Sequence, residues 1–194
     1  MSSSNATKNT PAGTSEPALS SINAPSGSLS TVDSQSSPKP HNPTILSTSA
    51  SDTQDLFNRV QTVLSTYLTS SPLYKILLST LSLSSAAHGH VTLELVVLPV
   101  HVNSKAVLHG SLSATLVDLV GGLAIASTGS KTGLSTDMHI SFAGSASEGD
   151  TLRIEGFAER VGATLAFTRV RIGKEVREGE QMLVATGSHT KYVR

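Results

Sequence analysis

Asp118 is the residue whose surroundings most directly suggest chemistry, because it is the only acid in an otherwise apolar segment, residues 109–127. An acid on the solvent-facing stripe of a helix is the open alternative. A carboxylate among apolar neighbours must be paired, neutral or beside a cavity. Because perturbed acids in clefts often carry catalysis, Asp118 is a candidate catalytic group. Its nearest neighbours along the chain are Leu116, Val117, Leu119 and Val120.

The start of the same segment offers a second chemical group. If residues 110–127 are helical, His109 and Gly110 lie at the N-terminus, where free N–H groups and the positive end of the helix dipole are found. Glycine lets a ligand approach the backbone closely. The Gly110 N–H could therefore hold an oxyanion or a polarised carbonyl. A simple helix cap is the alternative explanation.

The spacing of the two groups has a consequence for assembly. Gly110 and Asp118 are eight residues apart, which is about 12 Å along a helix. They cannot act on one carbonyl within one subunit. Two subunits paired by a two-fold axis, with antiparallel helices, would bring Asp118 of one to Gly110 of the other, and symmetric dimers are the commonest assembly.

Polar residues on either side of this helix are further candidates. Asn103 could anchor a water or a turn, and a local loop role explains it equally well. Ser135 and Asp137 alternate with their neighbours on a predicted strand, which puts both on one face. That face could equally be an exposed polar surface.

Periodicity predicts the elements that position these residues. Ser51 to Gln54 has the spacing of a capping box, and apolar residues at helical spacing follow as far as Leu68. Pro72 ends that helix or begins the next element. Tight glycine turns between the later strands imply antiparallel neighbours. The prediction is an α+β domain with one antiparallel sheet and one long buried helix at 110–127. The predicted strands are 76–86, 90–98, 133–143, 150–161, 163–173 and 180–193.

Composition excludes several classes of function. The 194 residues carry 14 basic and 14 acidic side chains, so no dominant electrostatic partner such as nucleic acid is expected. The chain has no cysteine, which removes disulfides, thiolate metal sites and cysteine nucleophiles, and no metal site is predicted. No apolar run approaches the roughly 18 residues of a transmembrane helix. A mixed-charge sheet surface is expected for the basic and acidic residues that follow Gly149.

Residues 1–50 differ from the rest of the chain. They hold six of the eight prolines and no arginine. Such a segment cannot bury enough apolar surface to offset its ordering entropy, so we expect a disordered tail at 1–50 and one domain at 51–194. The absence of arginine argues against a mitochondrial transit peptide. We therefore expect a cytoplasmic protein, with mitochondrial association as the alternative.

The segment Leu108–Asp118, LHGSLSATLVD, resembles the helix-start signature of hot-dog-fold acyl-CoA thioesterases. The similarity is to the branch with eukaryotic thioesterase superfamily member 2 and the PaaI-like phenylacetate-degradation thioesterases. Further matches are Asn103 and the segments 133–138, 164–167 and 187–191, in the family's order. This resemblance implies a six-stranded antiparallel sheet wrapped around one helix. It also implies homodimers, usually paired into tetramers, with active sites at the dimer interface.

The resemblance also implies roles for single residues. Asp118 would be the nucleophile or, as favoured, the general base that activates water, and the Gly110 N–H would polarise the thioester carbonyl. Ser135 would position the water or the carboxylate, while Asn103 and His109 would hold the carbonyl end and the loop. Coenzyme A is part of the substrate, and no cofactor is implied. The residues that the resemblance implies as contacts of the coenzyme A portion are Asp137, Phe142, Arg160, Val161, Gly162, Thr164, His189, Thr190 and Lys191.

One residue departs from the family pattern. The motif usually reads His-Gly-Gly, and here Ser111 replaces the second glycine. A side chain at this position could crowd the oxyanion site, so a domain that binds acyl-CoA without hydrolysing it is the alternative function. A hot-dog dehydratase ranks last, because its catalytic histidine is expected beside a proline-marked helix start that His109 lacks.

Overall fold

The computed structural model describes residues 50–177 and 179–194. The predicted tail, residues 1–50, lies outside this part of the chain except for Ala50, the first residue of helix α1. The other helices are α2 (Pro72–Leu77), the short 3-10 turn η1 (Pro99–His101) and the long helix α3 (Gly110–Ser127).

Helix α2 corrects one predicted element. A strand was expected from residue 76, but α2 continues to Leu77 and strand β1 begins only at Ser82. The Ser71 hydroxyl accepts the Tyr74 N–H at the start of α2, and Pro72 occupies its first turn. A serine cap followed by proline favours a helical turn, and this local signal outweighs the apolar run that suggested a strand.

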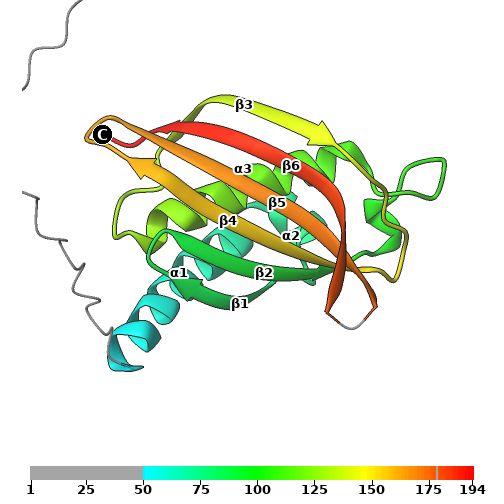
Figure 1. Ribbon diagram of the computed structural model, residues 1–194, viewed down its shortest axis with the longest axis horizontal. Coiled ribbons are helices and arrows are strands. Elements are labelled where there is room, and N and C mark those ends of the chain that lie inside the picture. The colour runs from blue at the N-terminus through cyan, green and yellow to red at the C-terminus, as the bar shows by residue number, and fades with distance from the viewer. Residues whose placement is uncertain (1–49, 178) are drawn as a thin grey trace, which may run out of the picture. The chain divides into compact units, whose positions relative to one another are not determined.

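The six strands form one antiparallel sheet in the order β1-β2-β4-β5-β6-β3 (Figure 1). The predicted strands after α3 are confirmed, except that β5 runs four residues beyond the expected end at 173. Strand β3 forms one edge of the sheet, beside β6. The strand bounds are β1 Ser82–Ala87, β2 His90–Val96, β3 Leu134–Phe142, β4 Thr151–Val161, β5 Leu165–Arg177 and β6 Glu180–Tyr192.

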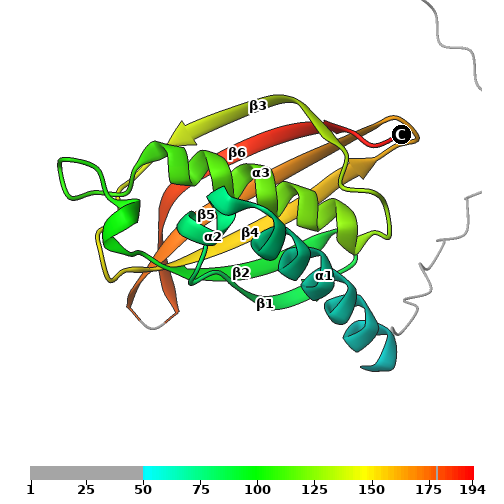
Figure 2. The same ribbon diagram turned by 180° about the vertical axis from the view of Figure 1, so that it is seen from behind.

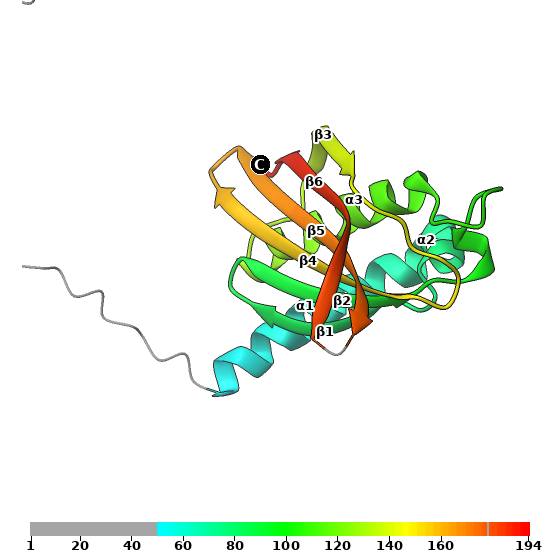
Figure 3. The same ribbon diagram turned by 45° about the vertical axis from the view of Figure 1, so that its right-hand side comes forward.

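The sheet curves around α3, with α1 beside that helix (Figures 2 and 3). Two glycines let the helix and the sheet approach closely. A Cβ at Gly187 would lie 2.7 Å from the Val117 side chain, and one at Gly156 would lie 2.7 Å from Val120. By length and apolarity α3 could span a membrane, but 72% of it is buried inside the fold, as in the core helix of a globular domain. The predicted central helix and its burial are confirmed.

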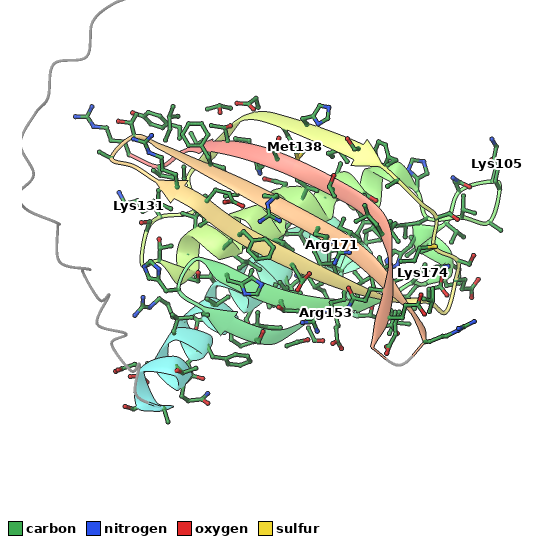
Figure 4. The ribbon with its side chains drawn as sticks, viewed as in Figure 1. Lys105, Lys131, Met138, Arg153, Arg171 and Lys174 are labelled. Atoms are coloured by element: carbon green, nitrogen blue, oxygen red, sulfur yellow. The ribbon has the colours of Figure 1, made fainter. Side chains whose placement is uncertain are left out.

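Strands β4 and β5 and the turn before β4 carry paired charges. Arg169 contacts Glu159 at 2.8 Å, and Lys174 contacts Asp150 at 2.9 Å. Arg153 and Arg171 both lie within 4 Å of Glu155 (Figure 4). The expected mixed-charge surface is therefore present, and these four cations are already matched by acids.

Candidate active site

The Asp118 carboxylate lies at the meeting point of α3, α2, β3 and β6. Its Oδ1 atom lies 2.9 Å from the Lys191 ammonium nitrogen and accepts the Ser135 hydroxyl at 3.3 Å. The Tyr74 hydroxyl donates to Oδ2 at 3.4 Å. His189 Nδ1 is 3.7 Å from Oδ1. Of the three alternatives for this acid (paired, neutral or beside a cavity), the structure shows the paired one.

These neighbours keep Asp118 ionised at neutral pH. Burial alone would raise its pKa, but the hydrogen bond and charge of Lys191, helped by His189 and Ser135, together lower it below the usual aspartate value. Its side chain is still 37% exposed. An ionised, solvent-accessible carboxylate can accept a proton from water.

His189 is fully buried beside the carboxylate. Within the described residues neither of its ring nitrogens has a hydrogen-bond partner. Burial, and then the charge of Lys191, lower the pKa of His189 below its usual value, against the opposing effects of Asp118 and Asp137. The imidazole is therefore neutral at pH 7, and Lys191 supplies the positive charge that faces Asp118.

Sequence analysis placed Lys191 and His189 among the coenzyme A contacts. The structure brings both side chains to Asp118 instead, on the buried face of β6, with Lys191 6% and His189 1% exposed. A coenzyme A contact by either residue stays a prediction. Their neighbour Thr190 lies on the opposite face, where its hydroxyl donates to Asp137.

We expect Lys191→Met to raise the pKa of Asp118, because the largest stabilising charge is removed. We also expect it to lower stability at pH 7 by about 1 kcal/mol, since the partly exposed pair is screened by solvent. A carboxyl with a lowered pKa stabilises the fold above its unfolded pKa, and this contribution is lost as the pH falls through the folded value. The stability gap between wild type and variant, measured by urea unfolding, should therefore narrow in acid. An equal gap at all pH values would contradict this assignment.

A β-bulge in β3 separates two residues predicted to share a face. Ser135 pairs with Lys191 across the β3–β6 ladder, but the register shifts and Asp137 pairs with Thr190. An extra residue in one strand rotates the alternation that follows it. Ser135 thus reaches Asp118, whereas Asp137 bonds to Thr190 on the outer face. The predicted common face is wrong for this pair.

The start of α3 has the geometry predicted for a backbone donor. Gly110 is the first residue of the helix after the His109 cap. Among the described residues its N–H donates no hydrogen bond. The Phe142 ring covers this point closely, since a Cβ at Gly110 would lie 3.2 Å from the ring edge. Gly110 and Phe142 therefore lie together at the N-terminus of α3, eight residues before Asp118.

Ser111 is anchored rather than loose. His109 Nδ1 accepts the Ser111 N–H at 3.1 Å, and the Ser111 hydroxyl lies 2.7 Å from the same nitrogen. The second amide of α3 is thus taken up by the imidazole, and the serine side chain is held against it. The amide left for a ligand is that of Gly110.

Asn103 acts locally in this structure. Its side-chain oxygen accepts the Lys105 N–H at 2.8 Å and lies 3.5 Å from the Val107 nitrogen, within the loop that precedes α3. Figure 4 shows Lys105 far out on this loop. The loop explanation for Asn103 is thus supported, and a contact between Asn103 and a substrate carbonyl stays a prediction.

The turn between β4 and β5 holds the remaining predicted residues. Arg160 and Val161 end β4, and Gly162 and Thr164 lie in the turn. Within the described residues Arg160 forms no ion pair, unlike Arg153, Arg169, Arg171 and Lys174. The turn adjoins the end of β6, because the Val193 N–H donates to the Thr164 carbonyl.

Two hollows meet at the carboxylate. One of about 230 Å³ lies between Tyr67, Tyr74, Asp118 and Ser135, and one of about 440 Å³ lies between Asp118, Ser135, Met138 and His189. The two tyrosines could not be identified as site residues from the sequence. Tyr67 fits the apolar spacing of a helix, and Tyr74 lies just before the wrongly predicted strand at 76–86.

Comparison with known proteins identifies the family of this chain. The thioesterase superfamily model matches residues 105–194. Acyl-coenzyme A thioesterase 13 of Homo sapiens is 37% identical over 117 residues, which is 60% of this chain and 81% of that protein. The chain belongs to the thioesterase superfamily. The predicted class of enzyme is confirmed, and the matched segment contains Gly110, Asp118 and Ser135.

Solved structures of thioesterases confirm the hot-dog fold. Zebra fish thioesterase superfamily member 2 has a TM-score of 0.64 and 33% identity, covering 71% of this chain and 98% of that chain. A Streptococcus mutans protein bound to acetyl CoA has a TM-score of 0.55 and 27% identity, covering 59% of this chain and 88% of that chain.

Proposed function

We propose that this thioesterase hydrolyses fatty or aryl acyl-CoA at a site shared by two subunits. The single observation that carries the proposal is the placement of the Asp118 carboxylate, which Lys191 and Ser135 hold through Oδ1 beside two hollows. The acyl-CoA substrate is supported by the similarity to acyl-coenzyme A thioesterase 13.

The reaction uses water and protein groups. Asp118 accepts a proton from water as the water oxygen attacks the thioester carbon. The negative charge that develops on the carbonyl oxygen is held by the Gly110 N–H of the partner subunit. The intermediate collapses with cleavage of the C–S bond, and Asp118 returns the proton to the departing sulfur. The products are the free acid and coenzyme A.

Edge strand β3 supports the dimer that this chemistry needs. It lies at the sheet edge and exposes Leu134 (74%), Met138 (41%) and Phe142 (63%). Figure 4 shows Met138 on this strand. An apolar, unpaired edge is a template for another strand. Pairing of two β3 strands about a two-fold axis would set the two α3 helices antiparallel, as the separation of Gly110 and Asp118 requires. We propose a homodimer of this kind, and a dimer of dimers as the full assembly.

The β4–β5 turn suits the coenzyme A portion of the substrate. Arg160 is exposed and unmatched within the described residues, and arginine binds phosphate well. The Streptococcus mutans relative was solved with acetyl CoA. We therefore propose that the phosphates lie at Arg160, Val161, Gly162 and Thr164, with Asp137 and Phe142 nearer the thioester.

Thiol release from acyl-CoAs of increasing chain length tests the activity. The chain has no cysteine, so a thiol reagent reports only the coenzyme A product. Turnover that ceases in Asp118→Ala supports the proposal. Tight acyl-CoA binding without turnover at any chain length would overturn it and favour the non-catalytic binding domain.

Subunit complementation tests the shared site. Asp118→Ala and Gly110→Pro should each be nearly inactive alone. In mixed dimers one of the two sites combines the intact Asp118 with the intact Gly110, so an equal mixture that exchanges subunits should regain about one quarter of wild-type activity. A mixture as inactive as its components, with exchange verified by mass, would place both groups in one subunit's site.

A further inference from the structure

The two oxygens of Asp118 have different surroundings. Oδ1 is held by Lys191 at 2.9 Å and Ser135 at 3.3 Å, with His189 at 3.7 Å. Among the described residues, Oδ2 has one hydrogen-bond partner, the Tyr74 hydroxyl at 3.4 Å. A carboxylate oxygen has two lone pairs. Oδ2 therefore keeps one free for water, whereas Oδ1 is surrounded by donors.

Tyr74 reaches this oxygen from a separate element. It lies in α2, where its N–H donates to the Ser71 hydroxyl and its carbonyl accepts the Leu78 N–H. Both ends of the short helix are thus fixed around this residue. Helix α2 precedes the segment 105–194 that matches the superfamily model, so the phenol comes from outside that segment.

We propose that Tyr74 is a positioning residue that orients the Asp118 carboxylate so that Oδ2 faces the attacking water. Its hydroxyl donates to one lone pair of Oδ2 and aims the other at the attacking water. The inference rests on the proposed function, in which Asp118 is the general base.

The electrostatics agree with this geometry. Burial, followed by the charge and hydrogen bond of Asp118 and by Tyr67, raises the pKa of Tyr74 to about 12. The phenol therefore stays a donor over the working range of pH. Donation to a carboxylate favours its ionised form. The other polar and titratable groups near Asp118 are Lys191, His189 and Ser135, with Tyr67 next to Tyr74 and Asp137 next to His189.

Tyr74→Phe, with Tyr67→Phe as the matched control, tests the inference. The Tyr67 hydroxyl bonds to Thr132 and has no hydrogen bond to Asp118 among the described residues. We expect Tyr74→Phe to lower kcat about 10-fold, the equivalent of about 1.4 kcal/mol, with KM nearly unchanged. This split identifies an interaction that acts on the chemical step. Tyr67→Phe removes a hydroxyl from the same hollow without touching Asp118 and serves as the control for the titration of Asp118.

A titration of Asp118 by carboxyl ¹³C NMR gives a readout that needs no turnover. The pKa of Asp118 should rise in Tyr74→Phe and stay unchanged in Tyr67→Phe. An Asp118 pKa or a kcat unchanged by Tyr74→Phe, in an enzyme that loses activity in Asp118→Ala, would overturn this inference and leave the proposed function intact. Full activity of Asp118→Ala would overturn the proposed function and the role of Tyr74 together.

Discussion

Replacement of Asp118 by asparagine should lower kcat for thioester hydrolysis by at least about 10²-fold, the contribution of a positioned general base. Asparagine keeps the size of the side chain and can still accept from Ser135, but it cannot take a proton from water. KM should change much less, because the proposed coenzyme A contacts lie on the β4–β5 turn. Stopped or continuous thiol assays measure both constants.

The control for this variant addresses Lys191. Asparagine leaves the buried ammonium without its charge partner, and an unpaired buried charge is destabilising. The double variant Asp118→Asn with Lys191→Met removes that charge and should recover stability while the activity stays lost. Recovery of activity in the double variant would show that the single variant failed by unfolding, and Asp118 would no longer be the base.

The fold could be predicted further than the site. The long apolar run of α3 and the glycine turns between the later strands specify one central helix and antiparallel neighbours. The wrong start of the strand predicted at 76–86 has a local cause. A continuous apolar stretch does not distinguish a strand from a helix, and the Ser71 cap followed by Pro72 favours a helical turn there. Long elements with a clear hydrophobic period are therefore predicted more reliably than short apolar runs.

The contacts around Asp118 depend on features of the tertiary structure that the sequence does not indicate. Alternation on β6 puts His189 and Lys191 on one face, but a lysine is rarely buried, so the sequence does not indicate that Lys191 pairs with Asp118. The bulge between Ser135 and Asp137 leaves no sequence mark. Tyr74 meets Asp118 across 44 residues of chain. Asp118 itself could be found because a single acid among apolar neighbours requires a partner.

Gly110→Pro should lower kcat by about 10²–10³-fold, as expected when one oxyanion donor is removed. The position suits proline unusually well. Gly110 is the first residue of α3, where proline is favoured because the N–H there has no helical partner. The preceding His109 has φ −73° and ψ 131°, an extended conformation that proline tolerates after it. The substitution therefore removes the donor and leaves the helix in place.

Gly110→Ala distinguishes the loss of the backbone N–H from the effect of an added side chain. Both variants place a Cβ about 3.2 Å from the edge of the Phe142 ring, but alanine keeps the N–H. Because Phe142 is 63% exposed, its ring can move aside, and we expect alanine to cost far less activity than proline. The ratio of the two kcat values therefore measures the backbone donor itself. If both variants lost activity equally, crowding at Phe142 would be the cause, and the carbonyl would have to be polarised by another group.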